Sequence, residues 1–125
     1  MLASAQDYLF KCVEPDFYDI DGYVDHNRLR ARLGVKENKL ARAINKSQRS
    51  LQKNPHSENI QKELRKIVYI FALLKEMMES EQKIAIWLRA PNPDYDGLTP
   101  LEVIMAGKSD SIINYLKDVQ KGALG

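Results

Sequence analysis

Apolar side chains in the middle of the chain recur at spacings of three and four residues, which is the period of an amphipathic helix. This spacing predicts a long helix that starts after Ser57 and runs to about Met78. From Ile67 onward the pattern is apolar nearly all round. We therefore expect the helix to be buried on two sides, either inside a core or at a subunit interface. The apolar positions are Ile60, Leu64, Ile67, Val68, Ile70, Phe71, Leu73, Leu74, Met77 and Met78.

Two shorter helices are predicted beyond it. Ser80 is a good N-cap for a helix that carries Ile84 and Trp87. A last helix is expected over residues 110–119. The fold class that follows is all-α.

Residues 37–53 fit a pair of short helices joined by a tight turn. Asn45 falls where such a turn needs a residue at positive φ, a place that glycine and then asparagine tolerate best. Ser47 suits the N-cap of the second helix. The inward positions are Leu40, Ile44 and Leu51, with the small Ala41 where the two helices touch. The pattern predicts a helix-turn-helix.

The segment from Trp87 to Glu102 has signals for a helix end, a turn and a helix restart. Pro91 and Pro93 cannot continue a helix, so the preceding one should stop at about Ala90. The restart combines Thr99 as N-cap, Pro100 at the first helical position and Glu102 at the third, which together predict a capping box, and Gly107 marks the end.

The net charge of +2 conceals three unlike blocks. Residues 1–27 carry −5, residues 28–53 carry +8, and residues 54–125 carry −1. One basic block between acidic or neutral neighbours is typical of an element that binds a polyanion, although a run of charge is often only a solvated face.

Within a helix-turn-helix, the second helix enters the major groove of DNA. Arg49 can bind guanine and Gln48 can bind adenine, whereas Arg42, Lys46 and Lys53 suit phosphates. The candidate DNA-binding residues are Arg42, Lys46, Ser47, Gln48, Arg49, Ser50 and Lys53. The alternative is an ordinary helical hairpin with a basic exterior.

The C-terminal motif W-L-x-x-P-N…G-x-T-P-L-E…G resembles the toxin-binding domain of the Xre/MbcA/ParS-like antitoxins. The match covers roughly residues 60 to 122 and departs at Pro93 and at Tyr95–Asp96, which lengthen the turn. The basic block is similar to their Xre-type domain, with Asn, Ser and Lys where that pattern has Gly, Thr and Arg. The matching positions are Trp87, Leu88, Pro91, Asn92, Gly97, Thr99, Pro100, Leu101 and Gly107 in the first motif, and Ala41, Asn45, Ser47, Ser50, Leu51 and Lys53 in the second.

The resemblance implies an antitoxin with two domains, residues 1–56 with an acidic arm and residues 57–125. It implies a partner toxin of the RES class, which attacks NAD, and binding of operator DNA to repress the shared operon. We expect a homodimer or a larger assembly, with residues 67–78 as the candidate interface, and a terminal tail that threads the toxin's active site. The candidate toxin-binding residues are Trp87, Pro91, Asn92, Asp94, Asp96, Lys121, Gly122, Ala123, Leu124 and Gly125.

Signals for an enzyme are weak. His26 and His56 lie in unrelated contexts without metal-ligand spacing, and the loop that starts at Asn92 opens like a calcium loop but lacks the bidentate ligand. We expect no catalytic residue, no metal and no cofactor. The lone Cys12, the lack of a signal-peptide pattern and the lack of a membrane-length apolar run predict a cytoplasmic protein.

Two other functions stay open: a stand-alone transcriptional regulator, and an interaction module whose helix-turn-helix is vestigial. Residues 1–23 have no firm interpretation. Residues 3–11 fit a short helix, and the acidic, aromatic residues 16–23 fit a segment that packs back on the basic block.

Overall fold

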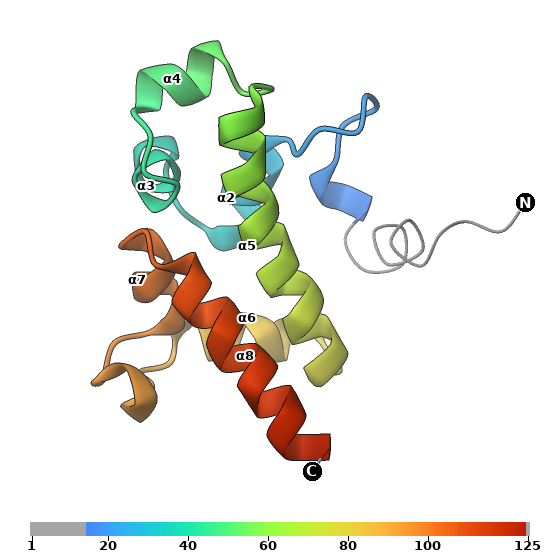
Figure 1. Cartoon of the computed structure of the whole chain (residues 1–125), viewed down its shortest axis with the longest axis vertical. Helices are drawn as coiled ribbons and strands as arrows, with labels where there is room; N and C mark the ends of the chain where they lie inside the picture. The colour runs from blue at the N-terminus through green and yellow to red at the C-terminus, as the bar shows by residue number, and fades with distance from the viewer. Residues whose placement is uncertain (1–14, 125) are drawn as a thin grey trace, which may run out of the picture.

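The computed structural model describes residues 15–124, and this part of the chain is all-α, as predicted (Figure 1). It contains no strand, only an isolated β-bridge between Tyr18 and Val24. No helix in residues 15–124 has both the length and the apolar character needed to cross a membrane. The elements are η1 (Pro15–Phe17), α2 (His26–Leu33), α3 (Glu37–Ala43), α4 (Gln48–Lys53), α5 (Glu58–Met77), α6 (Glu81–Arg89), η2 (Pro93–Tyr95), α7 (Pro100–Met105) and α8 (Ser109–Leu124).

Helix α5 runs through the molecule, with α2, α3 and α4 around one end and α6, α7 and α8 around the other (Figure 1). Its start after Ser57 agrees with the prediction, and the Ser57 hydroxyl accepts a hydrogen bond from the backbone N–H of Ile60. Its most extensive contact is with α8. Of the two environments predicted for residues 67–78, the structure shows a core: Ile67, Ile70 and Leu74 are buried within a single chain. This face of α5 is therefore not a free subunit interface.

One hydrophobic core joins the two predicted domains. The predicted boundary between residues 56 and 57 falls in the turn between α4 and α5, but apolar side chains from both sides of it form a single buried cluster. Helices α3 and α7, which belong to different predicted domains, also contact each other. The cluster includes Phe17, Leu29, Leu33, Leu40, Ile44 and Leu51 before the boundary, and Ile60, Leu64, Phe71, Leu88, Ile104, Ile112 and Leu116 after it.

The predicted helix starts in the second half are confirmed by their caps. The Ser80 hydroxyl accepts the backbone N–H of Lys83 at the start of α6. At the start of α7, the Thr99 hydroxyl accepts the N–H of Glu102 while the Glu102 carboxylate accepts the N–H of Thr99, which completes the capping box. Helix α6 ends at Arg89 with Ala90 as its C-cap, one residue from the predicted stop.

Helix α8 is longer than predicted. It begins at Ser109 and continues to Leu124, whereas the apolar pattern predicted an end near residue 119. The 3–4 spacing of apolar residues ends at Val119, and residues 121 and 122 are exposed, while Gln120 donates a 2.9 Å hydrogen bond to Glu76 of α5. The expectation of a chain without helical structure after Val119 is therefore wrong as far as Leu124. Gly125 and the side chains of Ala123 and Leu124 lie outside the described residues.

The first described segment packs back on the molecule, as expected for residues 16–23. Phe17 is buried, and its ring centre lies 5.2 Å from that of Phe71 on α5. Arg28 of α2 donates a 2.9 Å hydrogen bond to the carbonyl of Tyr18. The helix predicted over residues 3–11 lies outside the described residues.

Candidate nucleic-acid interface

The connection between α3 and α4 has the geometry that the sequence predicts. Asn45 adopts φ 59°, in the left-handed region, and Lys46 donates its backbone N–H to the carbonyl of Ala41 at 3.0 Å. Ala41 is buried where the helices meet. Ser47 is the N-cap of α4 and accepts the N–H of Ser50. These contacts hold α4 at a fixed angle to α3.

The basic block divides into two sets of cations. The three arginines of α2 are engaged with the chain itself: Arg28 binds backbone carbonyls, Arg30 binds Asn27 at 2.9 Å, and Arg32 pairs with Glu81 at 2.8 Å. The six cations of the block between residues 36 and 53 form no ion pair within residues 15–124. This second set, the α3–α4 basic surface, consists of Lys36, Lys39, Arg42, Lys46, Arg49 and Lys53, all exposed or partly exposed.

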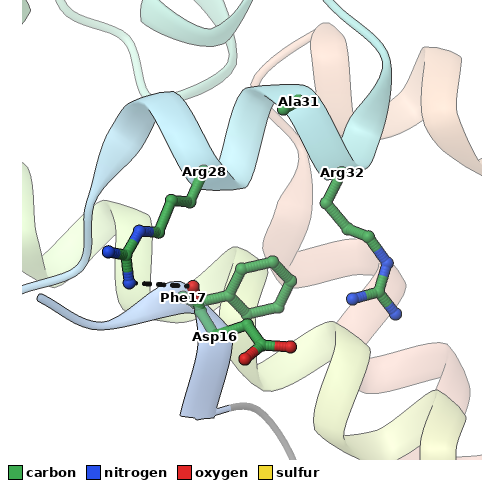
Figure 2. Close-up of a pocket in the computed structure, with 5 residues that line it drawn as sticks. All are labelled: Asp16, Phe17, Arg28, Ala31 and Arg32. Carbon is green, nitrogen blue, oxygen red and sulfur yellow. Dashed lines mark hydrogen bonds between the residues drawn. The ribbon is translucent and has the colours of Figure 1, made fainter.

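Two of these arginines, Arg28 and Arg32, also flank an open hollow of about 680 Å³ beside η1. Figure 2 shows Arg28 and Arg32, one turn apart on α2, on either side of the Phe17 ring. The Arg32 guanidinium carbon lies 5.5 Å from the centre of the Phe17 ring and 5.1 Å from that of Phe71. These cations hold η1 against the core and leave the basic surface to α3 and α4.

Gln48 lies differently from the prediction. Its amide nitrogen donates to Oε1 of Glu37, at 3.1 Å, and Gln52 donates to the same oxygen. The other oxygen of Glu37 lies 3.3 Å from Nε2 of His26, and both side chains are largely buried. Gln48 is exposed but not free, which corrects the expectation of an unattached base-reading side chain. The hydrogen bond forms because the packing of the two helices brings the N-terminal turns of α3 and α4 together.

Sequence reasoning missed the role of Glu37 in this cluster. The available signal was that Glu37 is the sole acidic residue in the basic block 28–53. The hydrogen bonds from Gln48 and Gln52, with a smaller contribution from His26, lower the pKa of the Glu37 carboxyl below its ordinary value. The carboxylate is therefore ionised at neutral pH.

The predicted DNA-binding residues thus fall into two groups. Ser47 caps α4 by accepting the backbone N–H of Ser50, its hydroxyl also donates to the Ser50 hydroxyl at 3.0 Å, and Gln48 donates to Glu37. The other four belong to the α3–α4 basic surface and are available to a ligand: Arg42, Lys46, Arg49 and Lys53.

The predicted toxin-binding turn is a closed loop that packs on α8. The backbone N–H of Asn92 donates to the carbonyl of Leu98 at 3.0 Å, and the Asn92 side chain accepts the N–H of Asp94. Asp94 accepts a 2.8 Å hydrogen bond from the hydroxyl of Tyr115 on α8, which raises the pKa of Tyr115. Burial raises the pKa of Tyr95, which lies against Tyr115. Asp94 thus serves the loop's own structure.

The other predicted toxin-binding residues vary in exposure. Trp87 is half-buried against the core, whereas Pro91 and Asp96 are exposed. Asp96 adopts φ 57°, so it closes the turn after η2. Two exposed apolar side chains were not predicted from the sequence: Ile86 on α6, which is 61% exposed, and Leu98 in the loop itself, which is 48% exposed. Of the predicted tail, Lys121 and Gly122 lie on α8 and are exposed.

Each histidine contacts an acidic side chain of the protein itself. His26 contacts Glu37, whereas His56 stacks on Tyr23 and pairs with Asp19 at 3.4 Å. Within residues 15–124 no three His, Cys, Asp or Glu side chains are grouped to hold a metal. Comparisons of the chain with protein-family models, with curated proteins and with solved structures find no match.

Proposed function

We propose that this protein binds double-stranded DNA through α3, the Asn45 turn and α4. The observation that carries the proposal is the α3–α4 basic surface, whose six cations form no ion pair with any residue between 15 and 124, although the cations of α2 are engaged internally. Unpaired cations on an exposed surface attract the phosphate backbone and release its counterions. Their position on a capped pair of short helices adds the geometry by which helix-turn-helix proteins place a second helix in the major groove.

The cations divide by position. Arg49 lies in the first turn of α4, the part of a second helix that reaches base edges, and it has the donors for guanine. Arg42 on α3, Lys46 in the turn and Lys53 at the end of α4 are placed for phosphates.

The test is a binding titration with a duplex from the region upstream of the protein's own reading frame. Arg49→Ala should cost about 1–3 kcal/mol and relax sequence preference, and Lys53→Ala should lower the slope of log affinity against log salt by about 1. Lys62→Ala, which removes an exposed cation from α5, is the matched control and should leave both unchanged. Equal affinity of the wild type, Arg49→Ala and Lys53→Ala would rule out α4 as the DNA-binding helix.

We further propose that this is a cytoplasmic antitoxin whose C-terminal half binds a RES-class toxin. The support is the motif resemblance together with two exposed apolar side chains in the same segment of the chain, Ile86 on α6 and Leu98 in the closed loop. The alternatives remain a regulator without a toxin and an interaction module that does not bind DNA. Because one short helix contacts few base pairs, we propose a symmetric dimer on paired half-sites, formed through a surface other than the buried face of α5.

The toxin proposal is tested with the product of a neighbouring reading frame. Ile86→Asp should abolish copurification of the protein with that product. Ile20→Asp changes a fully exposed apolar residue outside the C-terminal half and should not affect it. Truncation after Lys121 should leave binding intact and weaken inhibition of NAD consumption. Full inhibition by the truncated chain would leave the end of α8 without a role in blocking the toxin.

A further inference from the structure

Two amide side chains of α4 converge on one carboxylate of α3. Gln48 and Gln52 lie four residues apart, on the same face of α4, and both donate to Oε1 of Glu37. Oε2 of Glu37 is engaged by His26, itself largely buried at the start of α2. Three helices thus fix one carboxylate, and the carboxylate in turn holds two side chains at the surface.

The chemistry of a carboxylate decides which way the amides face. An ionised carboxylate only accepts hydrogen bonds, so the NH₂ group of each glutamine must point at Glu37. The carbonyl oxygens of Gln48 and Gln52 form no hydrogen bond within the described residues. The amide group of a free glutamine can rotate, so that it presents either its NH₂ donor or its carbonyl acceptor to a ligand. In Gln48 and Gln52 the NH₂ group is bound to Glu37, which leaves the carbonyl oxygen as the group available to a ligand.

The charge of Glu37 also calls for an explanation. It is the sole carboxylate in a block that otherwise has nine cations, and a negative charge there weakens the general attraction to phosphate. A role in orienting the amides of α4 accounts for a carboxylate at this position.

We propose that Glu37 is a positioning residue that fixes Gln48 and Gln52 with their carbonyl oxygens outward, so that α4 selects DNA bases carrying an amino group in the major groove. Those bases are adenine, through N6, and cytosine, through N4; guanine O6 and thymine O4 present acceptors instead. This inference rests on the proposed DNA binding.

The first arm of the test needs no DNA. In the folded protein, Glu37→Gln should shift the NMR signals of the side-chain NH₂ groups of Gln48 and Gln52, whereas Glu58→Gln should not. Glu58 is an exposed glutamate at the start of α5 that pairs with Arg65, so its variant removes the same charge without contacting α4 amides. Unchanged NH₂ signals in Glu37→Gln would overturn the inference.

The second arm selects duplexes from a random-sequence DNA library. Wild type and Glu58→Gln should enrich adenine or cytosine over guanine or thymine roughly tenfold at one or two positions of each half-site. Glu37→Gln should still bind but lose that preference. A preference that persists in Glu37→Gln overturns the positioning role alone. If the wild type binds no duplex, the proposed function fails and this inference fails with it, whatever the NMR signals show.

Discussion

At the scale of single residues, two backbone positions in the left-handed region face each other. Asn45, in the α3–α4 turn, and Gly107, between α7 and α8, adopt φ 59° and 83°. A Cβ added at Gly107 would lie 2.8 Å from Oδ1 of Asn45, closer than such atoms approach in proteins. The sequence alone predicts both turns, because Asn and Gly signal them locally. It cannot predict that they touch, since that depends on how α3 packs on α7.

Gly107→Ala should therefore destabilise the protein by about 1–3 kcal/mol, because the new methyl group is strained at this φ and displaces Asn45. Gly122→Ala is the matched control: Gly122 is helical, a Cβ there meets nothing within 4 Å, and the change should stabilise α8 by about 0.5–1 kcal/mol. Urea titrations followed by circular dichroism measure both. Equal stability of the two variants would contradict this account of Gly107.

The hydrogen bonds of Gln48 show a second limit of prediction at this scale. The side chain was expected to face outward because its position on α4 is exposed, and it is exposed. Its partner Glu37 lies eleven residues earlier, on another helix, and no local rule pairs the two. Exposure can be predicted from a pattern, whereas a partner requires the packing angle between α3 and α4.

At the scale of elements, helix starts were predicted better than helix ends. Ser47, Ser57, Ser80 and Thr99 each accept a backbone N–H of the helix that follows, and such caps depend on neighbouring residues only. The end of α8 was placed too early because the apolar pattern stops there. A helix whose last turns are exposed needs no apolar residue in them, so the pattern carries no information about its end.

The capping box at the start of α7 should make the stability of the protein depend on pH. Backbone and side-chain hydrogen bonds with Thr99 lower the pKa of Glu102 below its ordinary value of 4.5. A carboxyl with a lowered pKa in the folded state gives stability that is complete above pH 4.5 and is lost as the pH falls through the lowered value. Glu102→Gln keeps the capping box but does not titrate. Between pH 7 and pH 3 the urea midpoint of Glu102→Gln should fall less than that of the wild type, and the exposed control Glu79→Gln should behave like the wild type.

At the scale of the whole molecule, α5 makes one core out of two sequence regions. Its buried side chains belong to one cluster with those of the helices before it and after it, and α3 contacts α7 directly. The sequence predicts the parts but divides them at residue 56, following the family resemblance and close to the change of charge after residue 53. The charge pattern along a sequence indicates the properties of the surface, but it does not predict which apolar side chains pack together in the core. A shared core implies that the basic half and the C-terminal half unfold as one cooperative unit.

That cooperativity can be measured with the single tryptophan. Trp87 is half-buried on α6, so its fluorescence reports the C-terminal half, whereas Leu40 is fully buried on α3 in the basic half. Leu40→Ala should cost about 2–5 kcal/mol, as a truncated leucine leaves a cavity. If the core is one unit, the Trp87 transition in urea must move by the same amount as the circular dichroism transition, while the exposed neighbour Lys39→Ala moves neither. A Trp87 transition that stays at its wild-type midpoint in Leu40→Ala would instead establish two domains that unfold independently.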